Sequence, residues 1–300
     1  MKIAIAGGTG FVGQHLTNHL INQGHTIYVL TRSPERYTNS ESVRYIEWLN
    51  EGSQPEKHIT KLDAFINLAG DSLFGYWTKA KKDRILQSRI QATSQVMELL
   101  KNMEHKPEVL VNASAVGYYG TSQTVSFTEK TTTPGDDFLA RVTTQWEKHA
   151  KQAEPLGIRT VFARFGIVLG NGGSLPLMTL PFKLMLGGKV GSGDQWMSWI
   201  HIKDAVELIE FALHHKELHG PLNVTSPSPV TNRTFSKKVA NVLHRPYWLP
   251  APSIAVQSLL GEMSMLVLEG QSVLPRKAQT LGYNFHYPQL DHALQAIYSK

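Results

Sequence analysis

The first half of the chain alternates short apolar runs with longer amphipathic stretches. The runs are apolar on both faces, as in strands buried inside a parallel sheet, and the stretches between them have helical spacing. The pattern predicts helices over about 11–23, 79–103 and 137–154. It predicts strands at Lys2–Ala6, Thr26–Leu30, Val43–Trp48, Ala64–Leu68, Val109–Ala113 and Arg159–Arg164. This alternation indicates an α/β fold with a doubly wound parallel sheet.

The pattern loosens after residue 165. Glycine-rich turns at 170–173 and 191–193 separate short segments, and helical spacing returns over 254–263, after Pro275 and near 289–298. We therefore expect three parts. Residues 1–165 form most of the sheet, with later segments crossing back; residues 166–245 form a smaller substrate lobe with crossovers; and residues 246–300 form a small helical domain.

The composition is that of a folded globular protein. Of 300 residues, 41% are hydrophobic and 18% are charged, which excludes a long disordered chain. No apolar run approaches the roughly 18 residues that a membrane span needs. A strand is predicted from Lys2 onward, so we expect no leader peptide and a cytoplasmic location. The absence of cysteine excludes disulfides, Cys-ligated metals and a thiol nucleophile.

The formal charge of +6 changes this picture little, because the basic residues are scattered. The densest group, at 79–84, is interrupted by Asp83 and has helical spacing, which is typical of a solvated helix face. We therefore predict a small anionic ligand, with no nucleic-acid and no membrane partner. No set of histidines and carboxylates is identified as a metal site, so no metal is predicted.

A glycine-rich turn follows the first predicted strand and opens the first predicted helix. Its sequence is Gly7-Gly8-Thr9-Gly10-Phe11-Val12-Gly13. Glycines at this spacing let the backbone turn tightly and approach a pyrophosphate, whose charge the helix N-terminus attracts. Residues 1–165 are therefore predicted to bind a dinucleotide, with Gly7, Thr9, Gly10, Phe11, Val12 and Gly13 in contact with it.

The end of the second predicted strand indicates which dinucleotide is preferred. An acidic residue there would bind the ribose hydroxyls of NAD, but the chain reads Leu30-Thr31-Arg32-Ser33. Arg32 can pair with a 2′-phosphate, to which Thr31 and Ser33 can donate hydrogen bonds. The sequence therefore predicts NADP(H); the alternative is an exposed arginine without a ligand.

Together with the glycine turn, two motifs carry a family resemblance: Asn67-Leu68-Ala69-Gly70, and Ser114 with Tyr118-Tyr119-Gly120. The chain resembles an extended short-chain dehydrogenase/reductase of the NAD-dependent epimerase/dehydratase superfamily. It is similar in particular to the "epimerase family protein" subgroup, which has a small C-terminal domain of unknown function. The motifs of that subgroup are Ser88-Arg89-Ile90, Trp146-Glu147, Gly191-Ser192-Gly193-Asp194-Gln195-Trp196, Ser198-Trp199-Ile200-His201 and Leu274-Pro275-Arg276-Lys277. The resemblance implies a Rossmann-type fold and adds Leu68, Ala69 and Gly70 to the cofactor site.

The wider superfamily uses Asn, Ser, Tyr and Lys, with Tyr and Lys spaced Y-x-x-x-K so that they share one helix face. This chain departs from that pattern. None of its ten tyrosines is followed by a lysine four residues later, and the matching helix has Leu139 and Thr143 at these positions. The resemblance leaves Ser114 as a group that polarises a carbonyl or caps the strand. It leaves Tyr118 or Tyr119 as a proton donor or a packing residue.

Four further residues are candidates for substrate contact: Arg89, Lys183, Trp196 and Trp199. Arg89 stands at the position of the family asparagine and could bind an anionic substrate or form a structural salt bridge. Core packing explains the tryptophans equally well. His201, in an alternating apolar segment, is interpreted as a buried residue rather than a catalyst.

Two functions follow as hypotheses. The first is an NADP(H)-binding oxidoreductase or epimerase-like enzyme that acts on a small carbonyl or hydroxyl compound. The second is an NADP-binding regulatory protein without catalytic activity. In either case a homodimer is the default expectation for an oligomer.

Overall fold

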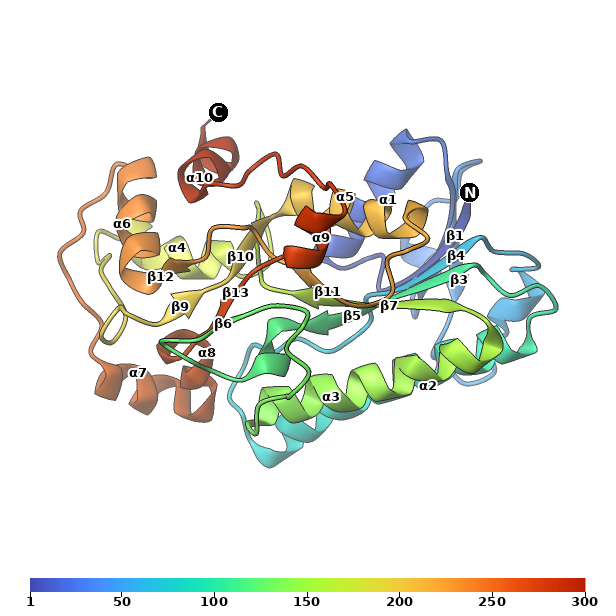
Figure 1. Ribbon diagram of the computed structural model, residues 1–300, viewed down its shortest axis with the longest axis horizontal. Helices are drawn as coiled ribbons and strands as arrows, with labels where there is room; N and C mark the ends of the chain where they lie inside the picture. The colour runs from blue at the N-terminus through green and yellow to red at the C-terminus, as the bar shows by residue number, and fades with distance from the viewer. Residues whose placement is uncertain (300) are drawn as a thin grey trace.

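The computed structural model describes residues 1–299, and its central element is a seven-stranded, all-parallel sheet (Figure 1). The chain starts near the middle of the sheet, builds outward to one edge, and then returns to build toward the other. This order confirms the doubly wound α/β fold. The strands across the sheet are β11 (Gly220–Val224), β7 (Arg159–Phe165), β5 (Val109–Ala115), β4 (Ala64–Asn67), β1 (Lys2–Ala6), β2 (Thr26–Thr31) and β3 (Val43–Glu47).

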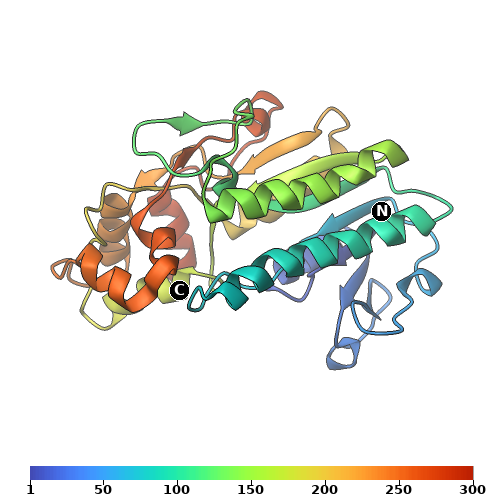
Figure 2. The ribbon, with the colours of Figure 1, turned by 90° about the horizontal axis from the view of Figure 1, so that it is seen from below.

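Helices cover both faces of the sheet. Helices α1 (Phe11–Asn22) and α5 (Ile202–His214) lie on one face, and α2 (Lys79–Asn102) and α3 (Phe138–Ala150) run side by side on the other (Figures 1 and 2). Alternate residues of a strand therefore enter different cores. Ile3 belongs to the same core as Leu16 of α1, whereas Ala4 belongs to the core that holds Val96 of α2. Burial on both faces explains why the strands are continuously apolar.

The remaining elements are shorter and lie mostly beyond the sheet. The strands are β6 (Ser126–Phe127), β8 (Ile167–Leu169), β9 (Trp196–Met197), β10 (Trp199–His201), β12 (Val230–Thr231) and β13 (Ser272–Val273). The α-helices are α4 (Leu175–Lys183), α6 (Asn232–Val242), α7 (Ser253–Leu260), α8 (Met265–Leu268), α9 (Arg276–Thr280) and α10 (Leu290–Tyr298). The 3₁₀ turns are η1 (Pro34–Arg36), η2 (Pro55–Lys57), η3 (Val116–Tyr119), η4 (Lys151–Leu156) and η5 (Gly261–Ser264).

A separate hydrophobic core holds the later segments together. Helices α4, α6 and α10 surround it, with Trp199 and Phe235 at its centre. Between α4 and α6, the chain returns to the sheet through α5 and β11. Sequence analysis does not predict β11, because Pro221 and Asn223 interrupt its apolar pattern; a proline is tolerated there because β11 is an edge strand. Within residues 1–299, no helix is both long and apolar enough to cross a bilayer.

Helix α5 begins directly at the end of β10, and His201 forms its N-cap. The Nδ1 atom of His201 accepts a hydrogen bond from the backbone N–H of Lys203 at 3.2 Å. The residue is only 7% exposed, and burial lowers the pKa of its imidazole from 6.5 to about 4. The side chain is therefore a buried, neutral cap at neutral pH.

This cap makes stability depend on pH in a defined window. The folded-state pKa of His201 lies below its ordinary value, so the unfolded chain takes up a proton more readily, and stability falls as pH drops from about 6.5 toward 4. Replacing His201→Asn keeps a cap acceptor without a titrating group. Urea unfolding at about pH 7 and pH 5 should show the wild type losing about 2 kcal/mol more than this variant. His219→Asn, at an exposed histidine, is the control; equal losses in His201→Asn and the wild type would contradict the assignment.

Candidate active site

The glycine turn joins β1 to α1 where three backbone segments meet. Gly7 has φ +79°, and a Cβ atom there would lie 2.8 Å from the carbonyl carbon of Leu68. A Cβ atom on Gly13 would lie 2.6 Å from the Cα atom of Gly8. Both contacts are too short for any other residue type. The turn therefore packs directly against the loop after β4, and the first turn of α1 packs against the glycine turn.

The N-terminus of α1 is open toward this turn. Gly10 is the N-cap residue, no side chain caps the helix, and its first turn has no acidic residue. An α-helix leaves the N–H groups of its first turn without partners inside the helix, here those of Phe11, Val12 and Gly13. The Phe11 ring contacts the turn at 170–173, and the carbonyl of Thr9 accepts a bond from the Gln14 amide at 2.9 Å. These donors and the positive end of the helix dipole suit an anion.

Arg32 lies at the same edge of the sheet as the glycine turn, because Ala6 and Leu30 are register partners in β1 and β2. Its side chain is exposed and forms no ion pair within the described part of the chain. The Oγ1 atom of Thr31 accepts a bond from the backbone N–H of Ser33 at 3.3 Å, which fixes the bend after β2. An unneutralised guanidinium therefore stands near the glycine turn.

Buried Asn67 shapes the loop after β4. Its amide donates to Oδ1 of Asn112 at 2.7 Å and to Oγ1 of Thr93 at 3.1 Å, and its own Oδ1 accepts from the N–H of Ala69 at 3.2 Å. These bonds hold Leu68–Gly70 against the glycine turn on one side. On the other side, the side chain of Arg89 packs against Gly70.

These three loops fit a phosphorylated dinucleotide. The glycine turn leaves space where Cβ atoms would be, the helix N-terminus supplies N–H donors, and Arg32 supplies a positive charge. The structure thus brings the predicted cofactor residues to one edge of the sheet: Gly7, Thr9, Gly10, Phe11, Val12, Gly13, Thr31, Arg32, Ser33, Leu68, Ala69 and Gly70. Their contact with a ligand stays a prediction.

A buried charged network lies below the end of β5. The Ser114 hydroxyl donates to Oε1 of Glu147 at 2.7 Å, and Arg164 donates to both carboxylate oxygens of Glu147 from Nε and Nη2, each at 2.8 Å. Arg164 is 3% exposed and Glu147 is 8% exposed. Burial alone would lower the pKa of Arg164, but the hydrogen bonds and charge of Glu147 outweigh it and raise that pKa. The network ties α3 to β5 and β7.

The two candidate tyrosines lie against this network. The guanidinium carbon of Arg164 is 3.4 Å from the ring centre of Tyr118 and 4.9 Å from that of Tyr119. The Tyr119 hydroxyl donates to buried Asn223 at 2.7 Å, and burial raises the pKa of Tyr119. The Tyr118 hydroxyl donates to the Thr132 carbonyl at an exposed position. Of these two phenols, Tyr118 is the more accessible.

The helix positions that correspond to the superfamily Tyr and Lys take part in packing. Leu139 contacts Gly117, the residue before the two tyrosines. The Thr143 hydroxyl donates to the carbonyls of Leu139 and Ala140, each at 3.0 Å. At these positions α3 therefore offers neither a phenol nor an ammonium group.

The four substrate candidates do not gather at one place. Arg89 donates to the carbonyls of Asp71 and Ile85 and lies 5.0 Å over the Trp146 ring; burial lowers its pKa to about 10, so it remains cationic at neutral pH. No carboxylate pairs with it in residues 1–299, so the salt-bridge alternative is not found.

The other three candidates have other neighbours. Trp196 is partly exposed and donates to the Gln123 carbonyl at 2.9 Å. Trp199 has no exposed surface and belongs to the core around α6, so the structure assigns it to packing rather than to a substrate surface. Lys183 is exposed at the end of α4 and lies 5.7 Å over the Tyr298 ring of α10. The four candidates therefore lie in different surroundings.

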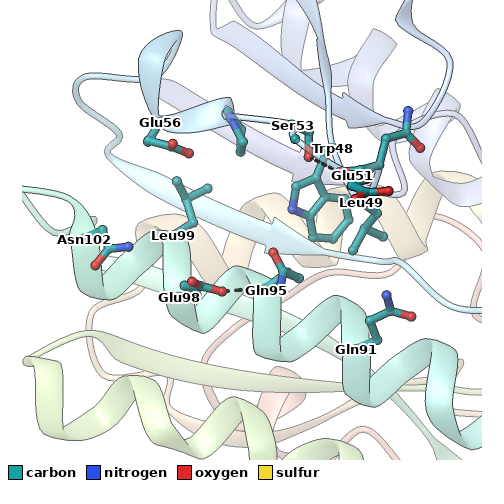
Figure 3. A pocket seen from close by; sticks show the side chains of 13 residues that line it. Trp48, Leu49, Glu51, Ser53, Glu56, Gln91, Gln95, Glu98, Leu99 and Asn102 are labelled. Atoms are coloured by element: carbon teal, nitrogen blue, oxygen red, sulfur yellow. Dashed lines mark hydrogen bonds between the residues drawn. The ribbon is translucent and has the colours of Figure 1, made fainter.

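A cavity of about 440 Å³ lies between the loop after β3 and α2 (Figure 3). Three carboxylates line it, those of Glu51, Glu56 and Glu98, and Gln95 and Glu98 are hydrogen-bonded across one wall. None of Ser114, Tyr118 or Tyr119 is among its lining residues. The amide of its lining residue Asn50 donates to the Arg32 carbonyl at 2.9 Å, so the cavity adjoins the end of β2.

Sequence reasoning missed the role of Arg164 and the pairing of Glu147. Arg164 entered only as the end of a predicted strand, and Glu147 only as a motif residue. Their contact joins a helix to a strand across the sheet face. The spacing of residues along the chain does not predict such a contact. The only available signal is that two charged residues fall within elements predicted to be buried.

Fold and site together define a Rossmann-type protein with a dinucleotide-binding edge. A model of the NAD dependent epimerase/dehydratase family matches residues 3–224, and a domain of unknown function, DUF1731, matches residues 251–297. The chain is 48% identical to the epimerase family protein YfhF of Bacillus subtilis over 297 residues, covering 99% of this chain and 98% of YfhF. The chain belongs to the NAD dependent epimerase/dehydratase family.

Solved structures agree with this assignment. The crystal structure of human epimerase family protein SDR39U1 (isoform 2) with NADPH is similar with a TM-score of 0.87 and 32% identity, covering 99% of each chain. A nucleoside-diphosphate sugar epimerase from Corynebacterium glutamicum is similar with a TM-score of 0.78 and 29% identity, covering 99% of this chain and 58% of that one. The resemblance inferred from the motifs is confirmed.

Removing one partner of the buried pair should destabilise the fold strongly. Glu147→Gln leaves the Arg164 charge buried without its counter-ion, so unfolding in urea should show a loss of about 3–5 kcal/mol. Glu154→Gln, at an exposed glutamate of the following 3₁₀ turn, should change stability by less than about 0.5 kcal/mol. Similar stabilities for the two variants would contradict the tie between α3 and the two strands described above.

Proposed function

We propose that the protein is an NADP(H)-binding oxidoreductase or epimerase-like enzyme that acts on a small carbonyl or hydroxyl compound. One observation carries this proposal: an uncapped helix N-terminus behind the glycine turn lies at the same sheet edge as the unpaired Arg32. The first feature suits a pyrophosphate and the second suits a 2′-phosphate. NADPH in the human relative's structure supports the choice of NADP(H) over NAD.

Different residues of the chain would bind the cofactor and donate the proton. The turn at Gly7–Gly13 binds the central pyrophosphate and Arg32 binds the 2′-phosphate of the adenosine ribose, and the loop Leu68–Gly70 lies between that turn and α2. Bound NADPH supplies a hydride. Tyr118 is the proton donor we favour, because its hydroxyl is at an exposed position, whereas Ser114 is held by buried Glu147. Ser114 then acts mainly by holding the network in place.

Arg32 should distinguish the two dinucleotides. Removing its charge in Arg32→Gln deletes charge-assisted hydrogen bonds worth about 1.5–3 kcal/mol, which is roughly 10- to 100-fold in NADPH affinity. NADH affinity should change little, because NADH has no 2′-phosphate. Calorimetric titration with both nucleotides measures this difference.

Arg36→Gln is the matched control for that titration. Arg36 is also exposed and follows β2, but its guanidinium lies 3.9 Å from Glu35. The control should bind NADPH like the wild type. Equal losses of NADPH and NADH affinity in Arg32→Gln, or a larger NADPH effect in Arg36→Gln, would contradict the assignment of the 2′-phosphate site.

A catalytically silent NADP-binding protein is the second candidate. It is favoured by the hydrogen bonds of the three candidate hydroxyls, since Ser114, Tyr118 and Tyr119 each donate to a protein oxygen. It is also favoured by Leu139 and Thr143, which leave α3 without the usual acid and base groups. Such a protein would retain the nucleotide-binding edge and transmit its occupancy to a partner.

Turnover separates the two candidates. Wild-type protein mixed with NADPH and a panel of small aldehydes, ketones and keto acids should oxidise NADPH, followed by its absorbance. Tyr118→Phe should lower kcat by roughly 100-fold or more while NADPH affinity is retained, because general acid catalysis contributes about that much. Tight NADPH binding with no NADPH oxidation and no chemical change in any panel compound would support the silent protein instead, since an epimerase leaves the NADPH absorbance unchanged.

A further inference from the structure

A second group of chemically active side chains lies at the opposite edge of the sheet. His25, Glu210 and His214 each offer one ligand atom, and these three atoms lie within 4.8 Å of one another. Glu210 and His214 are four residues apart on α5 and so share one helix face. His25 comes between α1 and β2. Two segments that are distant in sequence thus present two imidazoles and one carboxylate to a common point.

The hydrogen bonding of this cluster is incomplete. The carboxylate of Glu210 is 2.6 Å from Nε2 of His19 through Oε2, but its Oε1 is 3.8 Å from Nε2 of His25, too far for a hydrogen bond. The other ring nitrogen of His25, Nδ1, is paired with the N-terminal amine of Met1 at 3.1 Å, whereas Nε2 is buried and has no hydrogen-bond partner among residues 1–299. A buried polar atom without a partner costs stability unless a further group satisfies it.

The geometry leaves room for a small cation. Three atoms at most 4.8 Å apart surround a point at most about 2.8 Å from each, so shifts of less than about 1 Å bring them to the 2.0–2.2 Å at which zinc binds imidazole and carboxylate. Two histidines and one glutamate are a ligand set that zinc accepts, with the fourth position left to water or another imidazole. His19 is hydrogen-bonded to the Glu210 carboxylate at 2.6 Å and orients it. His214 is exposed, which gives an ion access from solvent.

We propose that His25, Glu210 and His214 form a zinc-binding site that joins the start of β2 to the C-terminal end of α5. The site stands apart from the nucleotide: Lys2 and Thr26 are register partners at the amino edge of the sheet, whereas Gly7 follows β1 at the carboxyl edge. Its role is structural, because the ion would cross-link α5 to the connection that follows α1. Sequence analysis predicts no metal, because spacing alone does not bring His25 to α5.

Zinc titration of the tag-free, chelator-treated full chain tests the proposal. Calorimetry with ZnCl₂ should give one ion per chain and a raised melting temperature in its presence. His214→Ala and His25→Ala should each weaken zinc binding by at least about 100-fold, since even outer-shell losses cost 10- to 100-fold. His214 is exposed, so its variant should fold normally. Substituting Co²⁺ should give the visible absorption of a tetrahedral ion in the wild type but not in His214→Ala or His25→Ala.

His219→Ala is the matched control, because His219 is an exposed imidazole four residues after His215 in the same stretch of chain. It should bind zinc like the wild type. Absence of stoichiometric zinc uptake, or equal weakening by His214→Ala and His219→Ala, would overturn the proposal and indicate adventitious binding to surface histidines. NADPH titrations of the same samples should be unchanged by zinc, so a failure of this site is distinguishable from a failure of the nucleotide site.

Discussion

Coverage of the parallel sheet on both faces is the constraint on which the rest of the structure depends. With α1 and α5 on one side and α2 and α3 on the other, the strands have no free face for binding, and ligand chemistry is confined to the loops at the carboxyl edge. The close approach of Gly7 to Leu68 then decides the form of that edge. It draws the loops after β1 and β4 together, while the start of α1 stays open to an anion.

The same edge shows how stability and candidate chemistry share residues. Two buried charges must stay paired, since separating them would leave one uncompensated. Glu147 and Arg164 meet this requirement and at the same time hold the Ser114 hydroxyl and the ring of Tyr118. A change at any member of this network therefore acts on folding as well as on the site. This coupling explains why loss of activity alone is weak support for a catalytic role here, and why binding and stability need to be measured together.

Local patterns predicted the fold well because the sheet is strongly apolar and its helices are amphipathic. Six of the seven strands were predicted within two residues of their observed ends, as with β2 at Thr26–Thr31, whereas β11 was missed because Pro221 breaks its pattern. The position of Arg32 beside the glycine turn also followed from sequence, since parallel strands end at one edge. Contacts between distant segments did not: the partner of Arg164, the complete burial of Trp199 and the approach of His25 to α5 depend on packing that spacing does not encode.

The order in which the strands are joined has a consequence for how the chain is made. The edge strand β11 pairs with β7, but the α4 and α5 segments separate the two along the chain. During synthesis β7 leaves the ribosome before β11. One edge of β7 therefore has no partner strand until residue 224 has also emerged. A bare, apolar strand edge invites pairing with neighbouring chains. Nascent molecules thus pass through an interval of exposure to aggregation, during which holding by a chaperone has its greatest value.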